Sequence, residues 1–183
     1  MRVREIALCG DGKARLVVEM PDAERCTTDY APHIPRGAFR LFPGLYRHKC
    51  HNDANFTFRE ECENTEIPHL LEHLIIELQL SALDHATLRG ETEWDWSVDP
   101  AGIFRVNIEY ENECLVVGAI RLAERILNCI DTRTVEELDM EYEMDKLRVM
   151  AEIGQEQAAP APAPAPRSEV PQPAFAEPLP ATA

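Results

Sequence analysis

The stretch Ile67-Pro-His-Leu-Leu-Glu-His-Leu-Ile-Ile-Glu-Leu-Gln-Leu80 lies near the middle of the chain and has the pattern of a helix. Apolar residues at positions 70, 71, 74, 75 and 78 form one stripe along such a helix. Pro68 falls in the first turn, where its missing N–H does little harm, and Asn64 and Thr65 are candidate caps. We therefore expect a helix over residues 67–80 that packs through its apolar stripe.

Within this helix, the residues His69-Leu-Leu-Glu-His73 carry side chains suited to metal chemistry. Because positions four apart lie on one face of a helix, His69 and His73 can share one cation, with Glu72 beside them. This is the spacing of ligands and base in zinc hydrolases. Zinc, or another divalent metal, lowers the pKa of water to about 7, and Glu72 would act as the catalytic base. The alternative is chance spacing on the exposed side of an amphipathic helix.

The third metal ligand is expected on a strand. Over residues 103–111 apolar and polar side chains alternate, which places Arg105, Asn107, Glu109 and Glu111 on one face of that strand. If this face lines the site, Glu109 is our choice for the third ligand. Glu111, on the same face, is an alternative, either as a ligand or as a carboxylate that orients a histidine.

Four residues are candidates for binding the substrate or for orienting the metal ligands. Glu77 lies one helical turn beyond His73 and, like Glu111, is a possible ligand, orienting carboxylate or substrate-binding group. Arg105 and Asn107 share the strand face of Glu109 and would hold the substrate or the developing oxyanion.

A small group of metal-capable residues, His48, Cys50 and His51, precedes the helix. It has no second half at ligand spacing, so the favoured interpretation is an ordinary loop. A metal-storage or metal-sensing protein that uses Cys50 with the two helical histidines is a weaker hypothesis. The six cysteines form no Cys-x-x-Cys pair and are expected to be free thiols.

Residues 41–125 resemble the N-terminal domain of cyanophycin synthetase. Three blocks carry the resemblance: Leu41-Phe-Pro-Gly-Leu45 with His48 and Cys50 after it, the helical block from His69 to Gln79, and Pro100-Ala-Gly-Ile-Phe-Arg-Val-Asn-Ile-Glu-Tyr-Glu-Asn-Glu113. We therefore expect a stand-alone domain similar to this one. In the family, the domain precedes two ligase domains that extend a polymer of aspartate and arginine.

The resemblance implies a module that handles this polymer, and in some members a metallopeptidase-like site that cuts it. It carries that site over to His69, Glu72 and His73, and places Glu109 at the carboxylate of the family's Phe-Glu-Tyr segment. Two loops depart from the family pattern, at residues 51–62 and at residues 91–96, where a basic segment is replaced by Glu-Thr-Glu-Trp-Asp-Trp. These loops are expected to shape the choice of substrate.

Composition divides the chain into two parts. With 183 residues and 45% apolar content, residues 1–154 can form one domain with a core. Residues 155–183 are rich in alanine and proline and are expected to be a disordered tail, through which a partner protein could bind. The net charge of -15 argues against nucleic acid and anionic membranes as partners. The lack of a signal peptide or membrane-spanning pattern favours the cytoplasm.

The remaining pattern favours an α+β fold, a single small sandwich of antiparallel sheet and helices. A hairpin is expected from residues 3–9 and 14–20 around Asp11-Gly12, and strands from residues 93–98 and 103–111. Helices are expected over residues 39–46, 114–130 and 135–152, the last with Thr134 as its cap.

Two functional hypotheses follow from these features. The first is a zinc metallopeptidase-like hydrolase that cleaves a peptide or isopeptide amide bond, with a cyanophycin-like polymer of aspartate and arginine as a possible substrate. The second is a noncatalytic module that binds a polymer or a protein and keeps the helix only for packing.

Overall fold

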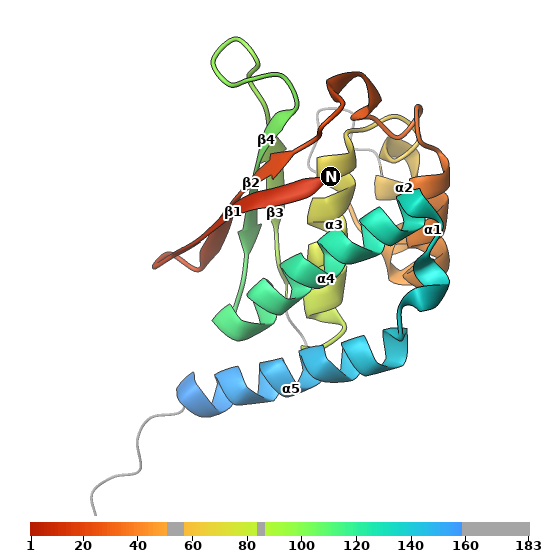
Figure 1. The fold of residues 1–183 in the computed structure, drawn as a ribbon. Helices are drawn as coiled ribbons and strands as arrows, with labels where there is room; N and C mark the ends of the chain where they lie inside the picture. The colour runs from red at the N-terminus through yellow and green to blue at the C-terminus, as the bar shows by residue number, and fades with distance from the viewer. Residues whose placement is uncertain (51–56, 84–86, 159–183) are drawn as a thin grey trace, which may run out of the picture.

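A four-stranded antiparallel sheet forms one layer of the molecule, and helices cover one of its faces (Figure 1). The computed structural model describes residues 1–50, 57–83 and 87–158 of the chain. The strands are β1 (Arg2–Cys9), β2 (Lys13–Glu19), β3 (Gly90–Glu93) and β4 (Ile103–Glu109), in the order β1-β2-β4-β3. The α+β sandwich expected from the sequence is therefore confirmed.

The sheet has one apolar and one polar face because burial alternates along β2 and β4, its two central strands. Phe104, Val106 and Ile108 of β4 are fully buried, whereas the residues between them are exposed or half-buried. The first hairpin turns at Gly12, whose φ of +77° lies in the left-handed region that glycine adopts without strain. β2 pairs along its length with β4, so the hairpin and the later strands form one continuous sheet.

Helix α3 (Ile67–Leu80) is the buried centre of the helical layer, and its bounds are those expected from the sequence. The helix is buried on nearly all sides, including Glu72 and His73, rather than along one stripe. Its N-terminus is held by Cys26, whose carbonyl oxygen accepts a 2.7 Å hydrogen bond from the Ile67 N–H. The face that carries the motif is therefore part of the protein interior.

The other helices surround α3. They are α1 (His33–Leu41), α2 (Phe58–Glu61), α4 (Glu113–Thr132) and α5 (Met140–Ala158), with short 3-10 helices η1 (Ala23–Arg25), η2 (Pro43–Arg47) and η3 (Val135–Glu137). α4 packs against α1, α3 and α5, and Figure 1 shows α5 along the end of the helical layer. Among these helices of the described chain, none combines the length and the apolar character needed to cross a bilayer.

Three expected elements differ from the structure by more than one or two terminal residues. The strand expected at residues 93–98 ends at Glu93, because Asp95 accepts hydrogen bonds from Ser97 and turns the chain. The helix expected from residue 135 is broken into η3 and α5, and Asp139, not Thr134, caps α5 through a bond from the Tyr142 N–H. The helix expected at residues 39–46 is divided between α1 and η2.

The C-terminal part of the chain is described only to Ala158. α5 extends past the expected domain boundary at residue 154, and the rest of the expected tail lies outside the described residues. All six cysteines are free, as expected.

Candidate metal site

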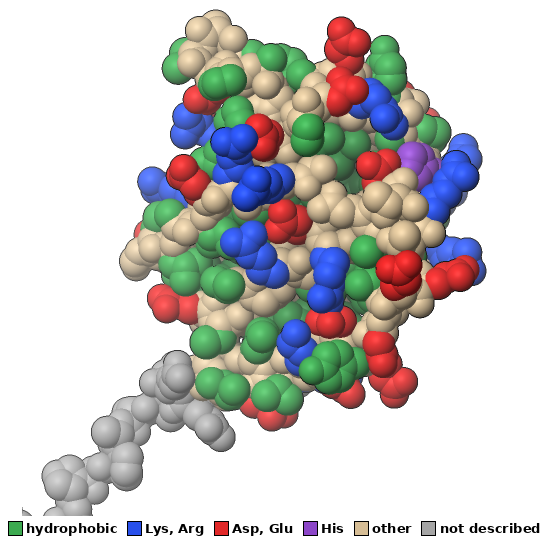
Figure 2. Space-filling view, in the orientation of Figure 1, with side chains coloured by type: hydrophobic (Ala, Val, Ile, Leu, Met, Phe, Trp, Pro, Cys, Tyr) green, Lys and Arg blue, Asp and Glu red, His purple; other side chains and the backbone are tan. Residues whose placement is uncertain are grey.

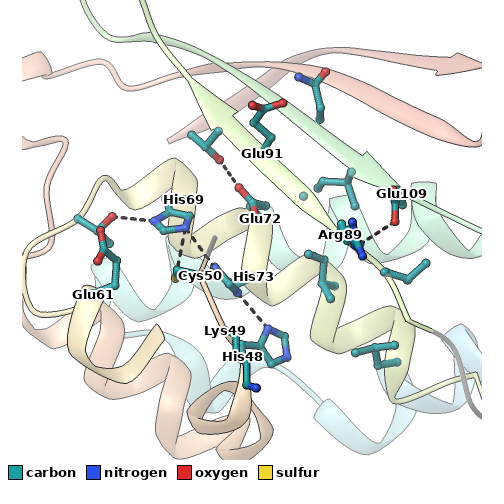
Figure 3. Close-up of a pocket in the computed structure, with 18 of the residues that line it drawn as sticks. His48, Lys49, Cys50, Glu61, His69, Glu72, His73, Arg89, Glu91 and Glu109 are labelled. Atoms are coloured by element: carbon teal, nitrogen blue, oxygen red, sulfur yellow. Dashed lines mark hydrogen bonds between the residues drawn. The ribbon is translucent and has the colours of Figure 1, made fainter. Parts of the chain in front are cut away.

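Three potential metal ligands from two segments converge beside the N-terminal half of α3. His69 and His73 come from α3, and Cys50 follows η2. The two Nε2 atoms are 3.2 Å apart, and Cys50 Sγ lies 3.9 Å from His69 Nε2 and 3.5 Å from His73 Nε2 (Figure 3). Ligand atoms bound at about 2.0–2.3 Å to one tetrahedral zinc ion would be separated by similar distances. The donor set of two imidazoles and one thiol therefore fits a divalent ion of the zinc type.

Thr65 fixes the orientation of the His69 ring. Its Oγ1 lies 2.7 Å from His69 Nδ1, on the side of the ring opposite the cluster. When Nδ1 carries the proton and donates to this hydroxyl, Nε2 keeps a lone pair that faces Cys50. Thr65, considered as a helix cap from the sequence, therefore orients a candidate ligand instead.

A carboxylate and a second imidazole hold the His73 ring in the same way. His48 Nδ1 lies 3.0 Å from His73 Nδ1, and His48 Nε2 lies 2.9 Å from Glu77 Oε2. One arrangement of protons satisfies both bonds: Glu77 accepts from His48 Nε2–H, and His48 Nδ1 accepts from His73 Nδ1–H. His73 Nε2 then keeps its lone pair for a cation.

Gly44 of η2 makes room for this carboxylate. A Cβ atom at position 44 would lie 1.7 Å from Glu77 Oε1, so a larger residue would displace the Glu77 side chain. The Leu-Phe-Pro-Gly-Leu block noted in the sequence thus contributes to the site through the space that its glycine leaves.

Burial keeps all three candidate ligands neutral before a cation binds. It lowers the pKa of His69 to about 4 and holds the pKa of His73 well below its usual value. Burial also raises the pKa of the Cys50 thiol to about 12. Phe58 contributes to this burial, since its ring stacks on His73 with centroids 3.8 Å apart. The imidazoles are ready to bind a cation, and the thiol must release its proton to do so.

Glu72 lies on the side of α3 that faces β3. Its Oε2 accepts a 2.6 Å hydrogen bond from the Thr92 hydroxyl, and burial raises the pKa of Glu72 to about 7. A Cβ atom at Gly90 would lie 2.5 Å from Glu72 Cγ, so β3 approaches the helix this closely only with a glycine there. The carboxyl group is thus poised between its neutral and charged forms near neutral pH.

The cluster and Glu72 line the same cavity, which has a volume of about 940 Å³. Its walls come from η2 and the segment after it, from α3, from β3 with the residues before it, and from the end of β4. Figure 3 shows the two helical histidines and Cys50 at one side of this cavity and β3 at the other. A ligand in the cavity can therefore reach both the candidate metal ligands and Glu72.

The structure brings His69 and His73 together, but it does not bring Glu109 to them. The helices cover the apolar face of β4, whereas Glu109 extends from the polar face and accepts a 3.0 Å bond from the Arg89 N–H (Figure 3). Figure 3 shows Glu109 away from the cluster, although both Glu109 and Asn107 line the cavity. Among the described residues that could group around an ion, Cys50 supplies the third ligand.

The remaining sequence candidates have separate places. Arg105 is exposed and forms a two-bond ion pair with Asp99, outside the cavity. Glu111 is exposed and does not line the cavity either. Glu77 orients His48, which is one of the three roles expected for it.

The sequence contains one indication of Cys50, the order His48-x-Cys50, which is separated from α3 by α2. From the sequence we nevertheless expect an ordinary loop there, because the distance along the chain from Cys50 to His69 and His73 matches no known spacing of metal ligands. His51, the third member of that group, lies outside the described residues.

Comparison with known families agrees with this structure. The sequence profile of the family described as the cyanophycin synthase-like N-terminal domain matches residues 15–131, which is more than half of the chain and includes the whole cluster. Comparison with individual curated proteins gives no match. From the extent of the profile match, this chain belongs to the family of cyanophycin synthase-like N-terminal domains.

Proposed function

We propose that this protein is a metal-dependent hydrolase that cleaves a peptide or isopeptide amide bond. One observation carries the proposal: Cys50, His69 and His73 converge on the wall of a cavity that Glu72 also lines. Three protein ligands leave a fourth position on a tetrahedral ion, which is the pattern of catalytic rather than structural zinc sites. A buried carboxylate beside such ligands is the arrangement that hydrolysis of an amide requires.

The chain's own residues supply the proton transfers of this reaction. A bound divalent ion would supply Lewis acidity, which lowers the pKa of water and polarises a carbonyl group. Glu72 takes a proton from the attacking water and passes it to the nitrogen of the leaving amine. The Thr92 hydroxyl, which donates to Glu72 Oε2, holds the carboxyl group in place during both transfers.

The proposed substrate is an extended polyamide that carries both carboxylates and guanidinium groups, such as a polymer of aspartate and arginine. The cavity is lined by basic residues, Lys13, Arg47, Lys49 and Arg89, and by acidic residues, Glu61, Glu66, Glu72, Glu91 and Glu109. Both signs of charge on a substrate can therefore find partners there. On the face drawn in Figure 2, too, Lys and Arg side chains are interspersed with Asp and Glu, despite the net charge of -15.

The test compares Glu72→Gln with Glu111→Gln, a matched substitution of an exposed carboxylate that does not line the cavity. Both variants are loaded with zinc, their metal content is measured, and release of primary amines from the aspartate–arginine polymer is followed. We expect full zinc content in both variants, loss of turnover by at least about 100-fold in Glu72→Gln, and retained turnover in Glu111→Gln.

Other outcomes contradict the proposal in distinguishable ways. Equal turnover in Glu72→Gln would exclude this residue as the base. Tight zinc uptake without hydrolysis would instead favour a metal-storage or metal-sensing protein. Failure to retain zinc, with the polymer still bound, would favour a noncatalytic binding module.

A further inference from the structure

β3 is an edge strand with an unpaired side. It is the last strand of the sheet and pairs only with β4 in the described chain. The Glu109 N–H donates a 2.9 Å bond to the Arg89 carbonyl oxygen. This bond shows that the backbone groups of Arg89 point toward β4. Because pairing alternates along antiparallel strands, the backbone groups of Glu91 and Glu93 point to β4. Those of Gly90 and Thr92 point to the free edge.

This free edge opens into the candidate active site. The cavity is lined by Gly90 and Thr92, whose positions face α3, and also by Glu91, which faces the opposite side of the sheet. A single cavity can be lined by residues from both faces of a strand when the cavity runs along the open edge of that strand. Gly90 is packed against Glu72, so the edge runs beside the proposed base.

The other edge of the sheet has a different character. In β1, the Val3 N–H donates a 2.7 Å bond to Glu124, and the Val3 carbonyl oxygen accepts from Arg121. Side chains of α4 therefore occupy part of that edge. At Gly90 and Thr92, no such bond links the backbone to another described residue outside the sheet.

We propose that the free edge of β3 binds the main chain of an extended polyamide substrate as an added strand. This inference rests on the proposed hydrolase function and assigns the way in which the substrate is held. Two outward-facing residues offer two N–H donors and two carbonyl acceptors to the substrate backbone. Main-chain bonds give binding along the strand, whereas the charged cavity walls bind the side chains.

The dimensions of β3 fit a short stretch of substrate. The strand has four residues, and Glu91 and Glu93 alternate with the outward-facing positions. Short length and charge prevent indiscriminate pairing of edges between protein molecules. The short length and the charge of β3 still allow it to bind a ligand whose charges complement those of the cavity.

The test uses a blocked Asp-Arg-Asp-Arg peptide that ends in a hydroxamate, which binds the metal and fixes the peptide in one register. Each amide of the peptide is N-methylated in turn, and the Kd for the zinc-loaded protein is measured by calorimetry. Methylation removes an N–H donor without changing charge. We expect at least about tenfold weaker binding when the methyl faces β3, and changes within about twofold at the intervening amides.

A sensitivity that alternates with every second amide supports strand addition. Uniform changes, or no change at any position, would overturn it, as would a parent peptide that binds no tighter than acetohydroxamate. A second arm uses the same sequence linked through aspartate side-chain carboxyls, which distinguishes a protein peptide from an isopeptide polymer as the source of the backbone. Turnover of the zinc-loaded protein is measured separately, so any of these three negative results would overturn strand addition without deciding whether the protein is a hydrolase.

Discussion

The proposed role of Cys50 as a metal ligand can be tested by a single substitution. Cys50→Ala removes one of three candidate ligands, so we expect zinc affinity to fall by about 100-fold or more. Cys62→Ala is the matched control, because Cys62 is also a buried thiol whose pKa is raised to about 12, but it is not part of the cluster. Competition with a chromophoric chelator measures both affinities.

Cobalt substitution adds an independent measure of the same contact. A sulfur ligand gives cobalt an intense charge-transfer absorption in the near ultraviolet, which imidazoles alone do not give. This band should be present in the native protein and in Cys62→Ala, and absent in Cys50→Ala. A band that persists in Cys50→Ala would show that the sulfur of this residue is not a ligand.

Glu72 is expected to destabilise the metal-free protein at alkaline pH. Burial raises its pKa to about 7 in the folded protein, against 4.5 for the ordinary side chain. A raised pKa contributes stability that is fully present below pH 4.5 and is lost as the pH rises through 7. Glu72→Gln has no charge to bury, so it should be more stable than the native chain at pH 8, by on the order of 3 kcal/mol.

Urea unfolding with a chelator present, at pH 4, 6 and 8, measures this difference. The gain from Glu72→Gln should disappear toward pH 4, where the native carboxyl is neutral in both states. The histidines act in the opposite direction, since the pKa of His69 is lowered to about 4 and its contribution is lost as the pH falls from 6.5 through 4. A gain for Glu72→Gln that is independent of pH would mean that carboxyl burial is not its cause.

At the scale of elements, the packing of η2 against α3 is what places the orienting carboxylate. Gly44→Ala would put a Cβ atom against Glu77 and push its side chain away from His48. We expect zinc affinity to fall by about 10–100-fold, because the His73 ring loses the groups that orient it. In a Glu77→Ala background the methyl group has room, so the same glycine substitution should have little further effect on affinity.

This double-mutant cycle separates orientation from general damage to the fold. Gly10→Ala is the control for substituting a glycine, since no atom lies within 4 Å of a Cβ built there. Additive effects of Gly44→Ala and Glu77→Ala on zinc affinity would contradict the proposed contact. Circular dichroism of each variant shows whether the fold is retained.

The elements that could be predicted from the sequence are those with a strong local pattern. α3 has the expected bounds because its apolar spacing and the proline in its first turn agree. The strand β3 was placed too late in the chain, since the alternation of Trp94, Asp95 and Trp96 resembles a strand although Asp95 makes a turn. Local alternation does not reveal a side chain that bonds to its own backbone.

The residues of the candidate site, like the elements, could be predicted from the sequence only where a strong local pattern exists. His69 and His73 follow from helical periodicity alone, because four residues make about one turn. The place of Cys50 depends on the packing of the segment after η2 against α3, a contact between residues 19 and 23 positions apart. Strand alternation correctly put Glu109 on a polar face, but it could not show that the helices cover the other face.

At the scale of the whole molecule, the cluster exists only when two separate segments are packed together. Cys50 and α3 lie against the same core, which includes Phe58, Leu70 and Leu74. An unfolded chain would not hold the three ligand atoms within 4.8 Å of one another, so zinc should bind the folded state far better. Metal binding is therefore coupled to the stability of the domain.

This coupling predicts that zinc raises the free energy of unfolding of the whole domain. At a free zinc concentration 100 times the Kd, the expected gain is about 2.7 kcal/mol, and it should vanish when a chelator is added. Cys50→Ala should show less than about half of this gain at the same zinc concentration, whereas Cys62→Ala should show all of it, from a lower starting stability. Urea unfolding with and without zinc measures each value. An equal gain in both variants would show that zinc stabilises the fold from another position.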